Sequence, residues 1–322
     1  MKHKLFGTQT GLPASELIMG GSNLGNRRGY GSTPQDALQI LSAYVDAGGN
    51  FIDVSDTYQF GEAEEIVGRF TEHKRHDFIL CSKYTRSSHP EPSLANTGNH
   101  RKAMRQAIEG SLKRLRTDYI DIYIPHFDDG ITPLEEIARG LEDLVASGKV
   151  LYTGLANFPA WKAAAIAAVI PLTAMQIEYN LLQRAPEREL TAMAKHFGLG
   201  MMCYSPLAGG LLTAKYRQGA SGRLTLSAAD GYHEDERTKT VIDELELIAR
   251  ELNATPGQIA LAWVLSKDVF PIIGARTLGH LEAGLTAVAI RLEADQIRRL
   301  DEISAIAMGY PHDLLATVQK KW

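Results

Sequence analysis

The chain of 322 residues has 44% hydrophobic side chains, and its 34 Lys and Arg against 38 Asp and Glu give a formal net charge of −4. That length fits a single (β/α) barrel, and the composition supplies enough apolar surface for a sizeable core. The near-neutral balance and the lack of a basic run argue against a nucleic-acid partner. Because no linker or low-complexity stretch divides the chain, we expect residues 1–322 to form one domain.

The sequence predicts neither export nor membrane insertion. No signal-type apolar core follows residues 1–7, and no stretch approaches the length that spans a membrane. Cys81 and Cys203 lie in apolar runs, which favours buried, reduced thiols over a disulfide. We therefore expect a cytoplasmic protein with no membrane, nucleic-acid or metal partner.

Strand-like apolar runs alternate with helix-like segments along the chain. We expect strands at 17–20, 51–54, 78–83, 119–125, 150–156, 173–178, 200–205 and 269–273. Helical patterns separate them, for example at 100–115 and 133–147. Eight such alternations predict an α/β fold in which parallel strands close into a (β/α)8 TIM barrel with helices outside.

Two segments fall outside this repeat. Residues 3–6 and 14–16 flank the turn-forming stretch 7–11 (GTQTG), which predicts a β-hairpin that plugs the amino-terminal end of the barrel. Residues 294–308 carry a further amphipathic pattern, so we expect an extra helix near the carboxyl terminus.

Three of the predicted strands end in ionisable side chains. Residues 51–58 (FIDVSDTY) end in Tyr58, 79–84 (ILCSKY) include Lys83, and 119–126 (YIDIYIPH) end in His126. A fourth segment, 154–158 (GLANF), brings Asn157 to the end of the fifth strand. In α/β barrels the carboxyl ends of the strands carry the chemistry. An Asp, a Tyr, a Lys and a His delivered there can transfer a proton to a carbonyl.

These segments, in this order, resemble the aldo-keto reductase family. The likeness extends almost from end to end and includes 12–25, 111–115 (SLKRL), 176–180 (QIEYN), 204–207 (YSPL) and 274–277 (GART). Such a series of ordered matches is far more specific than any single motif. The resemblance implies a barrel enzyme that moves hydride between a nicotinamide and a small carbonyl or alcohol substrate.

The resemblance implies a catalytic role for four residues. Tyr58 would donate the proton to the substrate oxygen, and Lys83 would lower the pKa of Tyr58. Asp53 would hold Lys83 in a charge-assisted pair, and His126 would orient the substrate oxygen. Asp56 is nearer to Tyr58 in sequence, but the family position of the lysine partner corresponds to Asp53. Taken singly, each residue has a structural alternative, such as a cap, a packing contact or a solvated strand end.

The implied cofactor is NADPH, with NADH possible, lying across the barrel mouth. No Gly-x-Gly-x-x-Gly follows a strand, which excludes a Rossmann nucleotide site. Asn157 and Gln176 would hold the nicotinamide carboxamide, and the ring would stack on Tyr204. Small residues after the seventh strand would let backbone amides approach the pyrophosphate. The other expected cofactor contacts are Gly20, Gly21, Ser205, Leu207, Gly209, Lys215, Arg223, Gly274, Arg276, Thr277 and His280; for Lys215 an ordinary loop position stays open.

Arg276 bears on the choice of cofactor. It follows the last strand at the start of a helix, where backbone amides favour an anion. A guanidinium there can bind the adenosine 2′-phosphate, which favours NADPH over NADH. Two departures from the family pattern accompany it. Ala156 stands where many relatives carry Ser, and Ala283-Gly284 stand where relatives often carry Glu-Asn.

Loops at the carboxyl ends of the strands set substrate specificity in barrels of this type. Tyr84 and Phe127 are the candidate substrate contacts, and further candidates are Tyr30 and the tail 310–322, with Asn23 and Leu24 near the nicotinamide. For each of them, packing is an alternative of at least equal weight. The leading hypothesis is an NADPH-dependent reductase of aldehydes or ketones. Two alternatives stay open: a nucleotide-binding regulatory subunit that senses redox state, and physiological oxidation of an alcohol with NADP+ or NAD+.

Overall fold

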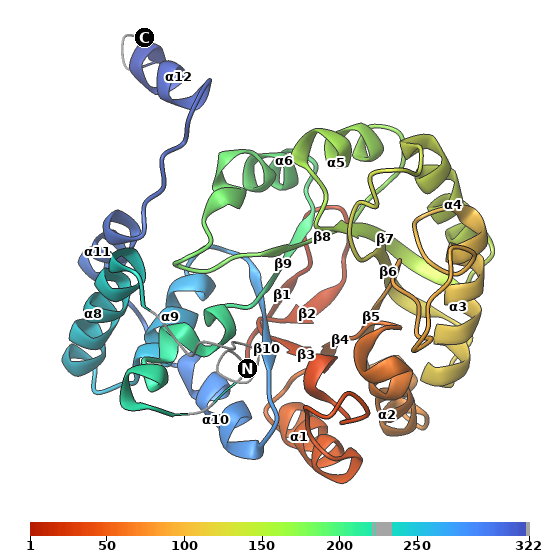
Figure 1. Cartoon of the computed structure of the whole chain (residues 1–322), viewed down its shortest axis with the longest axis horizontal. Helices are drawn as coiled ribbons and strands as arrows, with labels where there is room; N and C mark the ends of the chain where they lie inside the picture. Colours follow the sequence, from red (N-terminus) through yellow and green to blue (C-terminus); the bar gives the residue numbers. More distant parts are fainter. Residues whose placement is uncertain (221, 223–233, 320–322) are drawn as a thin grey trace.

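The structure of the chain, a computed structural model, describes residues 1–220, 222 and 234–319. Parallel strands close into a barrel in the order β10-β3-β4-β5-β6-β7-β8-β9 (Figure 1). These strands are β3 (Ile18–Gly20), β4 (Phe51–Asp53), β5 (Ile79–Tyr84), β6 (Ile120–Pro125), β7 (Val150–Ala156), β8 (Ala174–Glu178), β9 (Gly200–Tyr204) and β10 (Phe270–Gly274). The predicted (β/α)8 barrel is confirmed.

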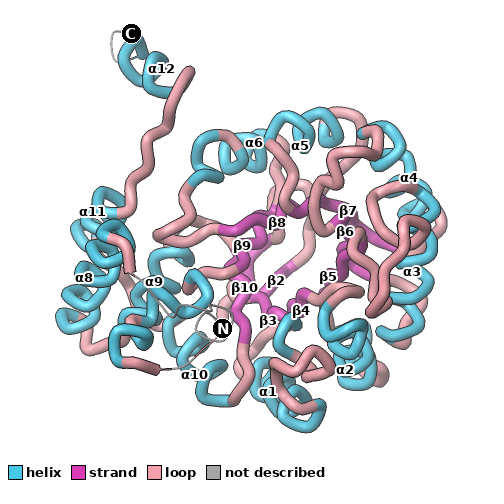
Figure 2. The backbone as a smooth tube through the Cα atoms, in the orientation of Figure 1, coloured by secondary structure: helices cyan, strands magenta, loops and turns pink. Residues whose placement is uncertain are grey.

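Helices form a ring outside the strands (Figure 2). They are α1 (Pro34–Asp46), α2 (Glu62–Thr71), α3 (Arg101–Leu115), α4 (Leu134–Ala146), α5 (Ala160–Ala167), α6 (Leu190–His196), α8 (Glu236–Glu251), α9 (Pro256–Leu265), α10 (Leu278–Ala287) and α11 (Ala294–Ile303). A further helix, α12 (His312–Gln319), lies outside this ring. Short 3-10 turns are η1 (Gly21–Asn23), η2 (Tyr58–Gly61), η3 (Arg75–Asp77), η4 (Ala185–Arg188), η5 (Ala208–Thr213) and η6 (Lys215–Gln218). No helix in the described ranges is long and apolar enough to cross a membrane.

Local sequence signals fix several helix starts. Thr33 caps α1 by accepting from the backbone N–H of Asp36, and Pro34 occupies the first turn, where its missing N–H is not needed. Thr255 and Gln258 form a reciprocal capping box at the start of α9.

Alternation along each strand separates two layers of side chains. On β5, Ile79 and Cys81 join the cluster inside the barrel, whereas Leu80 and Tyr84 join the cluster between strands and helices. Successive side chains of a strand point to opposite faces, so Lys83 faces the barrel interior like Cys81. Cys81 and Cys203 are both buried and free, as predicted.

The predicted amino-terminal hairpin consists of β1 (His3–Leu5) and β2 (Pro13–Ser15). Phe6, which follows β1, is fully buried and packs against Phe51 and Phe270 at the amino ends of β4 and β10, with ring centroids 5.4 and 5.1 Å away. A Cβ on Gly200 would come within 2.6 Å of the Phe6 ring, so only glycine fits under this plug. The barrel is thereby closed at its amino-terminal end.

The carboxyl-terminal segment differs from its prediction. The expected helix over 294–308 ends at Ile303 as α11, and the chain then extends away from the barrel to α12 (Figure 1). Tyr310 is 86% exposed. The expectation that the tail lines the substrate site is therefore wrong for the described residues up to 319, because α12 lies away from the barrel mouth.

Candidate active site

Asp53 and Lys83 form a buried ion pair at the carboxyl ends of β4 and β5. The Lys83 ammonium donates to both Asp53 oxygens at 2.7 and 2.8 Å and to the Val54 carbonyl at 2.6 Å. All three ammonium protons therefore have acceptors. Burial opposes the charge on Lys83, but Asp53 and Tyr58 outweigh it and raise the pKa of Lys83 above its usual range. Lys83 is a fixed cation at neutral pH.

Tyr58 lies over this cation at the start of η2. The Lys83 ammonium is 4.9 Å from the centroid of the Tyr58 ring. Burial raises the pKa of Tyr58, and the opposing effect of the Lys83 charge does not reverse that shift. Lys83 acts on the pKa of Tyr58 in the predicted, lowering direction, but the net shift is upward because desolvation of the phenolate dominates. Tyr58 keeps its proton at neutral pH and can donate it.

His126 directly follows β6 and faces Tyr58. The two rings meet edge to face, with centroids 5.8 Å apart. Burial, followed by the charges of Lys83 and Arg86, lowers the pKa of His126 to about 3. The imidazole is therefore neutral at physiological pH, and it can donate a hydrogen bond from only one ring nitrogen.

Three polar residues predicted to hold the nicotinamide lie along the next strand ends. Asn157, which follows β7 with a positive φ of 55°, donates to the His126 carbonyl and accepts from the Tyr204 hydroxyl at 2.9 Å each. Gln176 on β8 donates to Asp53 Oδ1 at 2.8 Å. The structure thus links all three to the Asp53 and His126 side of the mouth, and their contact with a carboxamide stays a prediction.

Further residues expected to contact the cofactor come from β3, β9 and the turns that follow. Gly20 ends β3 and Gly21 begins η1. A Cβ on Gly21 would lie 2.5 Å from Val54 Cγ1, so the backbone there packs tightly against the end of β4. Ser205 and Gly209 have φ angles of 53° and 67°. Leu207, between them, is half-buried. Ala208 and Gly210, on either side of Gly209, have φ angles of 49° and 96°. A turn of such successive residues can point backbone N–H groups toward one concave side, which suits an anion.

A cluster of positive charge lies at the amino-terminal end of α10. Thr277 caps this helix by accepting from the N–H of His280, and Gly274 and Arg276 precede it. Burial and the nearby Arg276 lower the pKa of Lys215, and burial, Arg276 and Lys215 lower the pKa of His280. The structure therefore brings together cations that are 61 residues apart in sequence at a helix end that favours anions. Arg223, predicted to join them, lies outside the described residues.

The two substrate candidates have different positions. Tyr84 is fully buried, stacks on Tyr123 with centroids 5.4 Å apart, and faces the helices. Its predicted substrate contact is wrong, because the alternation along β5 turns Tyr84 away from the face that carries Lys83. Phe127 is partly exposed with its ring 6.2 Å from that of His126, so it lies at the mouth.

Two of the further candidates pack against other parts of the protein. Leu24 is buried in the outer core, and the centroid of the Tyr30 ring lies 4.4 Å from the Arg276 guanidinium.

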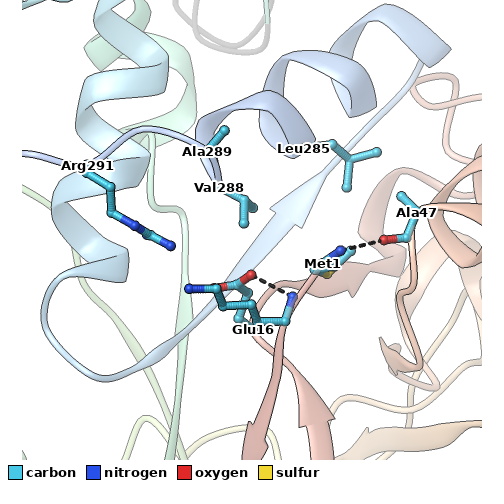
Figure 3. Close-up of a pocket in the computed structure, with 8 residues that line it drawn as sticks. Met1, Glu16, Ala47, Leu285, Val288, Ala289 and Arg291 are labelled. Carbon is cyan, nitrogen blue, oxygen red and sulfur yellow. Dashed lines mark hydrogen bonds between the residues drawn. The ribbon is translucent and has the colours of Figure 1, made fainter.

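A surface pocket of about 440 Å³ lies elsewhere, beside the amino-terminal hairpin (Figure 3). It is lined by Met1, Glu16 and Val288 among others, and the Met1 amino group at its edge donates to the Ala47 carbonyl. It contains none of the predicted catalytic residues, which lie at the carboxyl ends of the strands.

Sequence reasoning missed Ser55 and gave Asp56 no role of its own. The Ser55 hydroxyl lies 3.2 Å from His126 Nδ1 and 3.2 Å from Asp56 Oδ1. In the sequence, only their position in the strand-end segment 51–58 indicated that these two residues could belong to the site. Arg86, which follows β5, was also missed, although its charge acts on His126.

Comparison with known proteins places the whole barrel in one family. The sequence model described as "Aldo/keto reductase family" matches residues 16–305. The chain is 33% identical to an aryl-alcohol dehydrogenase [NADP(+)] of Phanerodontia chrysosporium, over 97% of this chain and 88% of the relative. It is 31% identical to a norsolorinic acid reductase of Aspergillus flavus, over 97% of this chain and 84% of the relative. It is 35% identical to an uncharacterized oxidoreductase of Bacillus subtilis, over 92% of this chain and 94% of the relative.

Proposed function

Because the chain belongs to the aldo/keto reductase family and is an oxidoreductase, we propose that it reduces aldehydes or ketones to alcohols with NADPH and that Tyr58 protonates the substrate oxygen. The observation that carries this proposal is the buried Asp53–Lys83 pair beneath Tyr58, with His126 beside it. A fixed cation under a neutral phenol stabilises the negative charge that the phenol acquires when its proton leaves.

The chain's own residues fit a nicotinamide dinucleotide. Tyr204 offers a partly exposed aromatic face at the end of β9. Lys215 and Arg276 offer positive charge at a helix amino terminus, with His280 beside them. The 2′-phosphate of NADPH suits this cluster better than the bare ribose of NADH, although NADH can bind at the same residues. When bound, the nicotinamide supplies the hydride.

Each catalytic residue then has one task. His126 donates a hydrogen bond that holds the substrate oxygen, and Tyr58 delivers the proton to that oxygen as negative charge develops. Lys83 stabilises the tyrosinate that remains, and Asp53 keeps Lys83 charged and in place. The same groups act in reverse when an alcohol is oxidised. Two relatives are named aryl-alcohol dehydrogenases, which favours aromatic aldehydes and their alcohols as the substrate pair.

The test is Tyr58→Phe, which removes the proton donor and keeps the ring. We expect turnover of an aromatic aldehyde with NADPH to fall by at least about a hundredfold, as for a lost general acid. NADPH affinity, followed by nucleotide fluorescence, should change little. Tyr119→Phe is the matched control, because it removes the hydroxyl of a tyrosine at the start of β6, at the far end of the barrel. Near-normal reduction by Tyr58→Phe would refute the assignment.

A further inference from the structure

Ser55 is fully buried and joins Asp56 to His126 through a single hydroxyl. Its Oγ lies 3.2 Å from Asp56 Oδ1 and 3.2 Å from His126 Nδ1. The backbone N–H of Thr57 also points at this oxygen, at 3.4 Å. Among the residues that the structure describes, His126 Nε2 has no hydrogen-bond partner and is the nitrogen left for a substrate.

A hydroxyl has one proton and two lone pairs, and these neighbours use all of them. One lone pair faces the Thr57 N–H. If the Ser55 proton points to an ionised Asp56, the remaining lone pair must accept a proton from His126 Nδ1. If it points instead to His126 Nδ1, Asp56 must bring a proton of its own to Ser55. The two arrangements exclude each other.

We propose that Ser55 transmits the protonation state of Asp56 to His126 as a choice between the two neutral imidazole tautomers. With Asp56 protonated, Nδ1 accepts and Nε2–H is a donor for a carbonyl oxygen. With Asp56 ionised, Nδ1–H donates to Ser55 and the bare Nε2 accepts from an alcohol hydroxyl. Ser55 and Asp56 are thus positioning residues that favour reduction in one state and oxidation in the other. This functional consequence rests on the proposed carbonyl chemistry, whereas the tautomer switch does not.

The surroundings of Asp56 place its titration where the switch is useful. Asp56 is 1% exposed. Burial and the Glu64 carboxylate on α2 raise the pKa of Asp56 to about 7, against smaller opposing effects of Arg114 on α3 and of hydrogen bonds from Ser55 and Thr57. From β6, Tyr123 also lies close enough for its pKa to be raised by Asp56, after the larger effect of burial.

The groups around His126 keep it neutral over the same range. Lys83 on β5 and Arg86 in the following loop are the cations that act on it, and Tyr58 on η2 is the facing phenol. Because burial and these cations hold the pKa of His126 at about 3, a change near pH 7 must be a change of tautomer. Lys83 is already paired with Asp53 and does not compete for Nδ1.

The test is nitrogen NMR of the protein labelled at its ten histidines, recorded from pH 6 to pH 8 without cofactor or substrate. His126→Gln identifies the His126 signals by their loss. In the wild type we expect the ratio of Nδ1–H to Nε2–H to rise about a hundredfold across this range, as for one proton titrating near pH 7. Ser55→Ala should abolish the change, and Asp56→Asn should give one tautomer at every pH.

Each outcome decides a separate question. A constant tautomer in the wild type, or an unchanged switch in either variant, overturns the inference, and Asp56→Asn serves alone if Ser55→Ala does not fold. A normal switch in a protein that reduces no carbonyl contradicts the proposed function and leaves the switch intact. A protein that reduces carbonyls with a fixed His126 tautomer supports the proposed function and contradicts the switch.

Discussion

Asp56 gives the fold a pH dependence that does not involve catalysis. Its pKa rises from 3.8 to about 7 on folding, because burial and then Glu64 disfavour the carboxylate. The folded chain therefore binds this proton more tightly than the unfolded chain, and the resulting stability is complete below about pH 4. It is lost as pH rises through the folded-state pKa. The total amounts to roughly 4 kcal/mol, of which about 3 kcal/mol falls between pH 5 and pH 8.

Asp56→Asn removes this loss, because the amide fills the same space and does not ionise. For a chain of this size the entropy of unfolding is about 0.7 kcal/mol per kelvin near 60 °C, so ~3 kcal/mol corresponds to about 4 °C. The quantity to compare is the melting temperature of Asp56→Asn minus that of the wild type. We expect this difference to be about 4 °C larger at pH 8 than at pH 5. Differential scanning calorimetry at matched ionic strength measures this difference.

Asp118→Asn is the matched control, because Asp118 is exposed just before β6. Its difference from wild type should stay within about a degree at both pH values, in line with the small effect of surface substitutions. Parallel pH profiles for wild type and Asp56→Asn would refute the reasoning, since they would mean that Asp56 is ionised in the folded chain at pH 5 as well. The tautomer switch would then lose its trigger.

Two further predictions concern buried and clustered charge. Arg276→Ala should weaken NADPH binding about ten- to a hundredfold and leave NADH binding nearly unchanged, since a charge-assisted contact contributes roughly 1.5–3 kcal/mol. Equal losses of affinity for both cofactors in a fluorescence titration would show that Arg276 does not bind the phosphate. Lys83→Met should destabilise the fold by about 3–5 kcal/mol, because Asp53 is left as an unpaired buried charge. The double variant Lys83→Met/Asp53→Asn should recover most of this in urea denaturation, and a double variant no more stable than the single one would contradict the reasoning.

The barrel could be predicted because its strands are buried on both faces. A strand such as β6 (IDIYIP) is then a nearly continuous apolar run, which stands out between amphipathic helices. Each predicted strand matched an observed one within one residue at either end. The carboxyl ends of neighbouring parallel strands meet at one rim, so the meeting of Asp53, Lys83 and His126 followed from the strand positions and the family pattern.

Contacts that depend on side-chain direction or on burial were harder to predict. Tyr84 adjoins Lys83 in sequence, yet the period of two along β5 puts it on the helix side. Because β5 is buried on both faces, its sequence did not mark which face was which. Charge pairing alone suggested an acidic Tyr58, whereas burial dominates its pKa. The path of the chain after Ile303 could not be predicted either, because an amphipathic pattern does not say which surface its apolar side contacts.

Ser55 and Asp56 illustrate a limit of a different kind. Both were visible in the segment 51–58, but a serine beside a carboxylate after a strand is most often a turn or a cap. Their role depends on His126, which is 71 positions from Ser55 in the chain and comes within 3.2 Å only when β4, β5 and β6 align in the barrel. Closing the barrel also buries Asp56 beside Glu64, so the same packing that delivers the hydroxyl to His126 shifts the group that controls it. A hydrogen-bonded chain of this kind therefore depends on how neighbouring strands align in the barrel, which the residues of the segment 51–58 do not show by themselves.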